Sequence, residues 1–91
     1  MDFIYEENRI YLKDEHKKLI AEVTFPYVKE TTVEINHTYV DESLRGQGIA
    51  SKLLEAVTKE LTRRNLKAIP TCSFAVSWFE KHPESNELLE P

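Results

Sequence analysis

The sequence is poor in glycine and cysteine, has no long apolar run and carries no excess of basic residues. Its one cysteine, Cys72, excludes an internal disulfide and a zinc site built from several thiolates. Twelve basic side chains stand against sixteen acidic ones, for a net charge of −4, so the sequence lacks the basic excess typical of nucleic-acid binders. No segment approaches the roughly 20 apolar residues that cross a bilayer. We therefore expect no binding to nucleic acid or membranes.

The length and composition are typical of one small domain spanning residues 1–91. Apolar residues make up 41% of the chain and charged residues 31%, a balance that permits one modest core. The first residues contain no basic segment followed by an apolar run, so the sequence predicts no signal peptide. Together with the lone cysteine, this indicates a reducing, cytoplasmic setting, and we expect a monomer or a weak dimer.

Alternation of apolar and polar side chains predicts β-strands in the first forty residues and again after residue 65. Pro26 interrupts the third strand, which indicates a bulge or an edge position. In the fourth strand, alternation places Val33, Ile35, His37 and Tyr39 on one face. The predicted strands cover residues 3–6, 9–13, 19–28, 31–40 and 66–72.

Two apolar stripes with a period of 3.6 residues predict helices. Asn65 can take the left-handed C-cap of the first helix, and Pro83 stops the second. The acidic tail, residues 84–91, is expected to fray. A strand, the long helix and another strand then form a parallel βαβ crossover within a mixed α/β (α+β) fold. The stripes are Ile49, Leu53, Ala56, Val57 and Leu61, then Phe74, Ala75, Trp78, Phe79 and His82.

Both glycines of the chain, Gly46 and Gly48, fall in the turn that opens the long helix. A helix start leaves backbone amides without partners and carries partial positive charge, and glycine lets an anion approach them. Arg45 and Lys52 have long, positively charged side chains that can extend to a bound anion, and Ser51 adds a hydroxyl donor. The turn therefore predicts an anion site, with a merely tight turn as the alternative.

Two common phosphate motifs are excluded at this turn. The Walker pattern requires a glycine followed by lysine, and neither glycine here precedes one. The dinucleotide fingerprint requires a third glycine where Ser51 stands and an acidic residue about twenty positions later, where the chain reads Lys-Ala-Ile-Pro.

The segment Arg45-Gly46-Gln47-Gly48-Ile49-Ala50 resembles the Arg/Gln-x-x-Gly-x-Gly/Ala signature of the GNAT N-acetyltransferases. Its setting is similar as well, with a long strand before it and an amphipathic helix, a strand and a second helix after it. The chain also resembles a short GNAT-like subfamily (the YjdJ type) in three segments in the same order, residues 36–38, 45–50 and 70–74. The resemblance covers about residues 19–82.

The resemblance implies a compact GNAT-like mixed sheet with antiparallel N-terminal strands, and acetyl-CoA as the cofactor. In that family the amides of the glycine turn grip the CoA pyrophosphate, and the preceding strand pairs with the pantetheine arm. Pro70 fits the splaying of two parallel strands that admits this arm, although an edge strand tolerates proline too. The expected cofactor-binding residues are Thr38, Tyr39, Val40, Arg45, Gly46, Gln47, Gly48, Ile49, Ala50, Ser51, Lys52 and Ser73.

Two side chains are candidates for catalysis. Cys72 precedes a helix whose dipole favours a thiolate, so it is interpreted as accepting the acetyl group or polarising the thioester; the alternative is a small apolar filler. His37 is interpreted as a base for the acceptor amine or for Cys72, and the alternative is a packed histidine. A metal site of His37, Cys72 and His82 has poor spacing, so no metal is predicted.

Two features of larger GNAT proteins are missing from this sequence. Only residues 14–18 separate the early strands, which leaves no room for the two acceptor-side helices, and the last helix has no tyrosine to act as general acid. The leading hypothesis is an acetyl-CoA-dependent N-acetyltransferase whose acceptor is a small amine, a peptide or a protein. The alternatives are a non-catalytic acetyl-CoA sensor or regulatory module, and an interaction domain without the cofactor.

Overall fold

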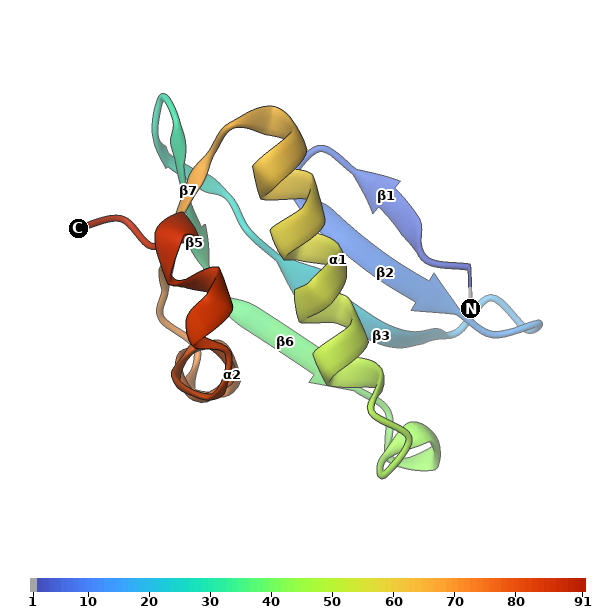
Figure 1. The fold of residues 1–91 in the computed structure, drawn as a ribbon. Coiled ribbons are helices and arrows are strands. Elements are labelled where there is room, and N and C mark those ends of the chain that lie inside the picture. Colours follow the sequence, from blue (N-terminus) through green and yellow to red (C-terminus); the bar gives the residue numbers. More distant parts are fainter. Residues whose placement is uncertain (1) are drawn as a thin grey trace.

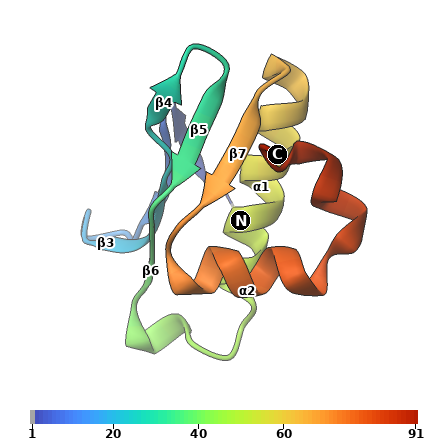
Figure 2. The ribbon, with the colours of Figure 1, turned by 90° about the vertical axis from the view of Figure 1, so that its left-hand side faces the viewer.

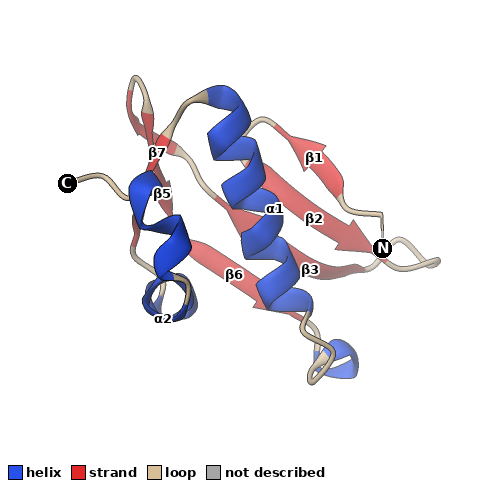
Figure 3. Cartoon of the chain, in the orientation of Figure 1, coloured by secondary structure: helices blue, strands red, loops and turns tan. Residues whose placement is uncertain are grey.

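Strands and helices follow the two periods of the sequence in the computed structural model, which describes residues 2–91. The strands form one layer, and α1 and α2 lie together on one side of it (Figures 1 and 2). Figure 3 shows the same two layers with strands in red and helices in blue. The strands are β1 (Ile4–Glu6), β2 (Arg9–Lys13), β3 (Leu19–Thr24), β4 (Tyr27–Lys29), β5 (Thr32–Ile35), β6 (His37–Val40) and β7 (Lys67–Pro70). The helices are α1 (Ile49–Arg64) and α2 (Ser73–Lys81), with 3₁₀ segments η1 (Glu42–Leu44) and η2 (Pro83–Leu88).

The strands belong to two sheets that share one long hairpin. The first sheet has the order β1-β2-β3-β6 and is antiparallel throughout. The second has the order β4-β5-β7, in which β4 and β5 are antiparallel and β5 and β7 are parallel. The elements β5, α1 and β7 therefore make the predicted parallel crossover, and the mixed fold is confirmed.

The predicted single strand over residues 31–40 is wrong, because the chain breaks at Asn36 into β5 and β6. Thr24 pairs with His37 and Tyr27 pairs with Val33, so the two residues 25–26 lie opposite the three residues 34–36. The extra residue is a β-bulge, which bends a strand and redirects its pairing. Beyond the bulge, β6 pairs with β3, whereas β5 before the bulge pairs with β7.

The bulge also reverses which residues face the core. Val33 and Ile35 are fully buried, as predicted, but His37 and Tyr39 are exposed. Because one inserted residue shifts a period of two by one step, the predicted common face for these four side chains ends at the bulge. The alternate residues of β6 are half-buried instead, and Val40 packs against the core.

The core lies between the two sheets and the helices, and its largest part is formed by the first sheet and α1. Ile10, Ala21 and Val23 from the sheet are fully buried, and the predicted helical stripe is buried against them. Leu54, expected at the edge of that stripe, is fully buried too. The α2 residues of the core are Ala75, Trp78 and Phe79.

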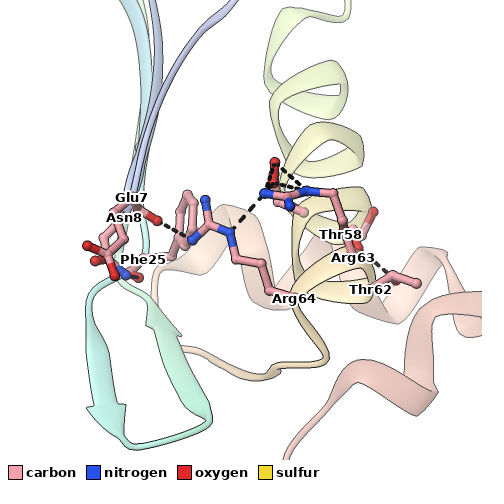
Figure 4. Close-up of polar contacts among 8 residues, drawn as sticks. Glu7, Asn8, Phe25, Thr58, Thr62, Arg63 and Arg64 are labelled. Carbon is pink, nitrogen blue, oxygen red and sulfur yellow. Dashed lines mark hydrogen bonds and ion pairs between the residues drawn. The ribbon is translucent and has the colours of Figure 1, made fainter.

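The C-terminal end of α1 is held in two ways. Asn65 takes the predicted left-handed cap, with φ of 59°, and its amide donates back to the last turn. Arg64 donates to the main-chain carbonyl of Glu7 in the β1–β2 turn and lies 3.6 Å from Glu60 (Figure 4). The hydrogen bond from Arg64 thereby joins the end of α1 to the N-terminal hairpin.

The acidic tail is not frayed, contrary to the prediction. Residues 83–88 form η2, and the Glu90 amide donates to the Ala68 carbonyl at 2.9 Å. The Thr32 hydroxyl, on a residue that is 2% exposed, donates to the Glu90 carboxylate at 2.5 Å. The tail therefore covers the free edge of β7, an arrangement that local composition does not reveal.

Candidate functional site

The chain between β6 and α1 is ordered by one carboxylate. Asp41 caps η1 by accepting from the Ser43 amide at 3.1 Å and from its hydroxyl at 2.6 Å. The Tyr39 hydroxyl also donates to it, at 3.2 Å, and Lys18 lies 3.4 Å away. These hydrogen bonds, chiefly those from Ser43, lower the pKa of Asp41 to about 2. The segment that delivers the glycine turn is thus fixed by a charged cap.

Both glycines of the turn have left-handed backbone geometry. Gly46 has φ of 84° and Gly48 has φ of 73°, values that side chains with a Cβ rarely adopt. Gly48 is the N-cap of α1 and provides no side-chain cap. Apart from the glycine itself and its two chain neighbours, no heavy atom of residues 2–91 lies within 4 Å of the position that a Cβ would take on either glycine. The approach to the turn is therefore open.

The amides at the start of α1 have no acceptor within residues 2–91. The first helical hydrogen bond joins the Lys52 amide to the Gly48 carbonyl at 3.1 Å. The amides from Gly48 to Ser51 precede that bond and remain unpaired in the described chain. Their partial positive charge is the feature of a helix start that favours anions.

A pocket of about 250 Å³ opens over these amides. Phe74, which the sequence indicated as core, is 38% exposed and contributes to this pocket instead. Leu44 also lines it, although no pattern in the sequence marked this residue. The lining residues are Val40, Leu44, Arg45, Gly46, Gly48, Ile49, Ala50, Ser51 and Phe74.

Several predicted binding residues lie around this pocket without closing it. Arg45, Gln47 and Lys52 are exposed on the turn and the first helical turn, so their side chains are accessible to a ligand. Ser73 is exposed at the start of α2. Tyr39 points its side chain to the opposite face of β6, so only its backbone faces the opening.

The splaying of the strands creates the opening in which the pocket lies. β5 and β7 pair as far as Ile35 and Pro70, after which β6 turns to β3 and the other chain turns into α2 (Figure 2). Within residues 2–91, β6 therefore has a partner strand on one edge only. Pro70 stands where the parallel pairing ends, as expected of a residue that cannot donate to the ladder.

The structure brings two predicted site residues together across this opening. The Thr38 hydroxyl of β6 lies 3.5 Å from the Cys72 sulfur. Cys72 is a free, half-buried thiol at the N-cap of α2. A sulfur at a helix start beside a hydroxyl is suited to contact a carbonyl group.

His37 does not lie with Cys72. Its neighbour Thr38 faces Cys72, and alternation along β6 turns His37 to the other face of the sheet. There its Nε2 lies 3.5 Å from Glu22, and its side chain is 53% exposed. The structure gives no contact between the two side chains that would support a direct activation of Cys72 by His37.

A buried tryptophan that the sequence marked only as core also contacts the site. The Trp78 indole Nε1 donates to the Ser51 Oγ at 3.0 Å, joining α2 to the first turn of α1. No single-sequence signal distinguishes such a contact from ordinary core packing.

The pocket over the turn is not the largest hollow. One of about 420 Å³ lies between α1 and η2, and its lining includes Lys59, Arg63, Glu84 and Glu87. Charges of both signs line it, so it lacks the local excess of positive charge that favours an anion. Among residues 2–91, no three metal-binding side chains form a cluster, and no helix is long and apolar enough to cross a bilayer.

Known proteins are similar to this chain in sequence and in architecture. A family model described as GCN5-related N-acetyl-transferase matches residues 9–88. Protein NATD1 of Xenopus tropicalis is 33% identical over 73 residues, which cover 78% of this chain and 67% of that protein. Human protein NATD1 is 32% identical over 73 residues, covering 78% of this chain and 65% of its own length.

Solved structures agree. A GCN5-like protein from Staphylococcus aureus superimposes with a TM-score of 0.82 at 35% identity, covering 98% of this chain and 87% of its own. Tetrahymena GCN5 shares the fold, with a TM-score of 0.64 at 16% identity over 84% of this chain and 51% of its own. With a family model that spans most of its length, the chain belongs to the GCN5-related N-acetyltransferase (GNAT) family.

Proposed function

We propose that this protein binds acetyl-CoA and transfers the acetyl group to an amine. The observation that carries the proposal is the set of unpaired amides from Gly48 to Ser51 under an open pocket. A diphosphate offers these unpaired amides hydrogen-bond acceptor oxygens, and its negative charge is attracted by their partial positive charge. Arg45 and Lys52, both exposed beside the turn, add positive charge.

The opening between β6 and the start of α2 is the proposed channel for the pantetheine arm. The free edge of β6 at Thr38, Tyr39 and Val40 offers backbone groups for it, and Phe74 and Val40 offer apolar surface. A route from the glycine turn along β6 leads to the contact between Thr38 and Cys72. This contact is the proposed site of the thioester.

When bound, acetyl-CoA supplies an acetyl group that is activated toward nucleophiles. One proposed role of Cys72 is to accept that group on its sulfur: the bond between the acetyl carbon and the CoA sulfur breaks, and CoA leaves as the thiol with the proton that Cys72 gives up. The other is to polarise the carbonyl, with Thr38 as hydrogen-bond partner. His37, beside Glu22 on the opposite face, is proposed to take the proton of an acceptor amine that approaches from that face. A reduced thiol suits the cytoplasmic setting expected from the sequence.

The uncovered face of the first sheet favours a peptide or protein as the acceptor. Within residues 2–91, no helix lies between β2 and β3, and α1, the helix that packs on the first sheet, covers its other face (Figure 1). A large acceptor therefore meets no obstruction on the side where His37 is exposed.

A pair of isosteric variants tests the diphosphate site. Asn and Asp both tolerate the left-handed geometry of Gly48, and they differ in charge. We expect Gly48→Asp to weaken acetyl-CoA binding in calorimetry by roughly tenfold more than Gly48→Asn does, because its carboxylate repels the diphosphate. S-acetylpantetheine, which lacks phosphate, should bind both variants equally. Equal acetyl-CoA affinity of two folded variants would refute the diphosphate site.

The second candidate function is a non-catalytic acetyl-CoA module. It is supported by the absence of tyrosine from α2, whose sequence is SFAVSWFEK. Turnover with a panel of amines and peptides separates the two functions, and intact-mass measurement after incubation with acetyl-CoA detects an acetyl adduct on Cys72. If Cys72→Ala keeps full turnover, the cysteine has no part in the transfer.

A further inference from the structure

The hydrogen bond from Trp78 to Ser51 has a fixed direction. An indole N–H only donates, so the Ser51 oxygen accepts in this 3.0 Å contact and its own proton must point elsewhere. Trp78 is 5% exposed, so water does not replace the bond easily. The orientation of the Ser51 hydroxyl is therefore set from α2.

No acceptor within residues 2–91 takes the Ser51 hydroxyl proton. Two other hydroxyls of α1 show the usual alternative, since Thr58 donates to the Glu55 carbonyl at 2.8 Å and Thr62 donates to the Thr58 carbonyl at 2.9 Å. Ser51 instead lines the pocket over the glycine turn. Its proton is left for a group that enters that pocket.

The indole that makes this bond is held on two sides. The His82 ring stacks on Trp78 at 3.9 Å and 13°, and its Nδ1 lies 2.7 Å from the Trp78 carbonyl. Phe79 packs edge-on, with ring centroids 5.2 Å apart. These contacts leave the indole N–H a single direction, toward Ser51.

We propose that Trp78 is a positioning residue for the cofactor, which orients the Ser51 hydroxyl to donate to a phosphoryl oxygen of the diphosphate. The inference rests on the proposed function, because the diphosphate is the acceptor that Ser51 lacks. Trp78 acts through Ser51 and needs no contact with the cofactor itself. Each hydrogen bond of such a chain strengthens the next by polarising it.

A double-mutant cycle tests the coupling. We expect Trp78→Phe, which keeps the aromatic ring and loses the N–H, to weaken acetyl-CoA binding about fivefold, and Ser51→Ala to weaken it at least as much. The double variant should bind no more weakly than Ser51→Ala alone. S-acetylpantetheine should bind all four proteins with the same affinity, and thermal unfolding checks that the variants fold. Thr58→Val is the matched control, since its hydroxyl serves the helix only.

A second measurement needs no variant. Trp78 is the only tryptophan, so its indole proton gives one assignable NMR signal. When Ser51 donates to a phosphate, its oxygen becomes a better acceptor, and the indole signal should move downfield with acetyl-CoA but not with S-acetylpantetheine.

The outcomes separate the inference from the function on which it rests. If the wild type binds acetyl-CoA but the two substitutions weaken binding additively, or weaken S-acetylpantetheine binding equally, Trp78 is only a structural residue. An indole signal that stays in place on acetyl-CoA binding overturns the inference in the same way. If the wild type binds no acetyl-CoA, the proposed function fails and the inference with it.

Discussion

At the scale of single residues, the turn before α1 depends on a charged cap. Asp41 accepts three hydrogen bonds, two from Ser43 and one from Tyr39, and these lower its pKa from 3.8 to about 2. A carboxyl whose pKa is lower in the folded than in the unfolded state stabilises the protein above the unfolded value. That stabilisation is lost as the pH falls through the folded value.

We therefore expect Asp41→Asn, which keeps an acceptor but removes the charge, to lower the Tm at pH 7 by a few degrees. The difference from wild type should shrink between pH 4 and pH 2 and vanish below about pH 2, where both side chains are neutral. Thermal unfolding followed by circular dichroism across this range measures it. In Ser43→Ala, which removes the main partner, the loss of stability should move to higher pH; a Tm difference independent of pH contradicts the account.

At the scale of elements, the long helix depends on both of its ends. Gly48 and Asn65 each take a left-handed conformation, with φ of 73° and 59°. The sequence predicted the cap at Asn65 because few other residues tolerate this geometry. The contribution of this cap to stability can therefore be measured by substituting Asn65.

We expect Asn65→Ala to lower the free energy of unfolding by about 1 kcal/mol, since alanine pays for the left-handed backbone without compensation. Asn65→Gly should leave it unchanged to within about 0.5 kcal/mol, because glycine adopts that backbone freely. Urea denaturation gives both values. A stable alanine variant indicates that the chain after α1 adopts another cap.

At the scale of the whole molecule, the tail completes the second sheet. Leu88 and Leu89 pack against the core, Lys67 donates to the Glu87 carbonyl, and Glu90 accepts from the buried Thr32 hydroxyl. These contacts join segments that are 20 and 58 residues apart in the chain. The tail thereby protects an edge that is otherwise available for pairing.

We expect Glu90→Ala to cost about 1–3 kcal/mol of unfolding free energy, because it leaves the Thr32 hydroxyl buried without a partner. Adding Thr32→Val removes that hydroxyl and should recover most of the loss. Urea denaturation of the single and double variants measures the coupling. If the two substitutions each lower the free energy of unfolding and their effects add in the double variant, the contact contributes little.

The sequence was most informative where structure depends on neighbouring residues. It predicted the hairpin, both helices, the parallel crossover and the glycine turn, since periodicity, caps and glycine geometry act within a few positions. It failed at Asn36, where a bulge reverses the facing of His37 and Tyr39. A single extra residue leaves no trace in the alternation, because its effect depends on the partner strand.

By itself, the sequence determined that two glycines open a long amphipathic helix and that a cysteine precedes the last helix. Only the tertiary structure decided that Thr38 meets Cys72 and that Trp78 meets Ser51, pairs separated by 34 and 27 residues. Such contacts depend on how the sheets splay and how α2 packs on α1. Packing is a property of shape and volume summed over many residues, so no local pattern records which side chains it brings together.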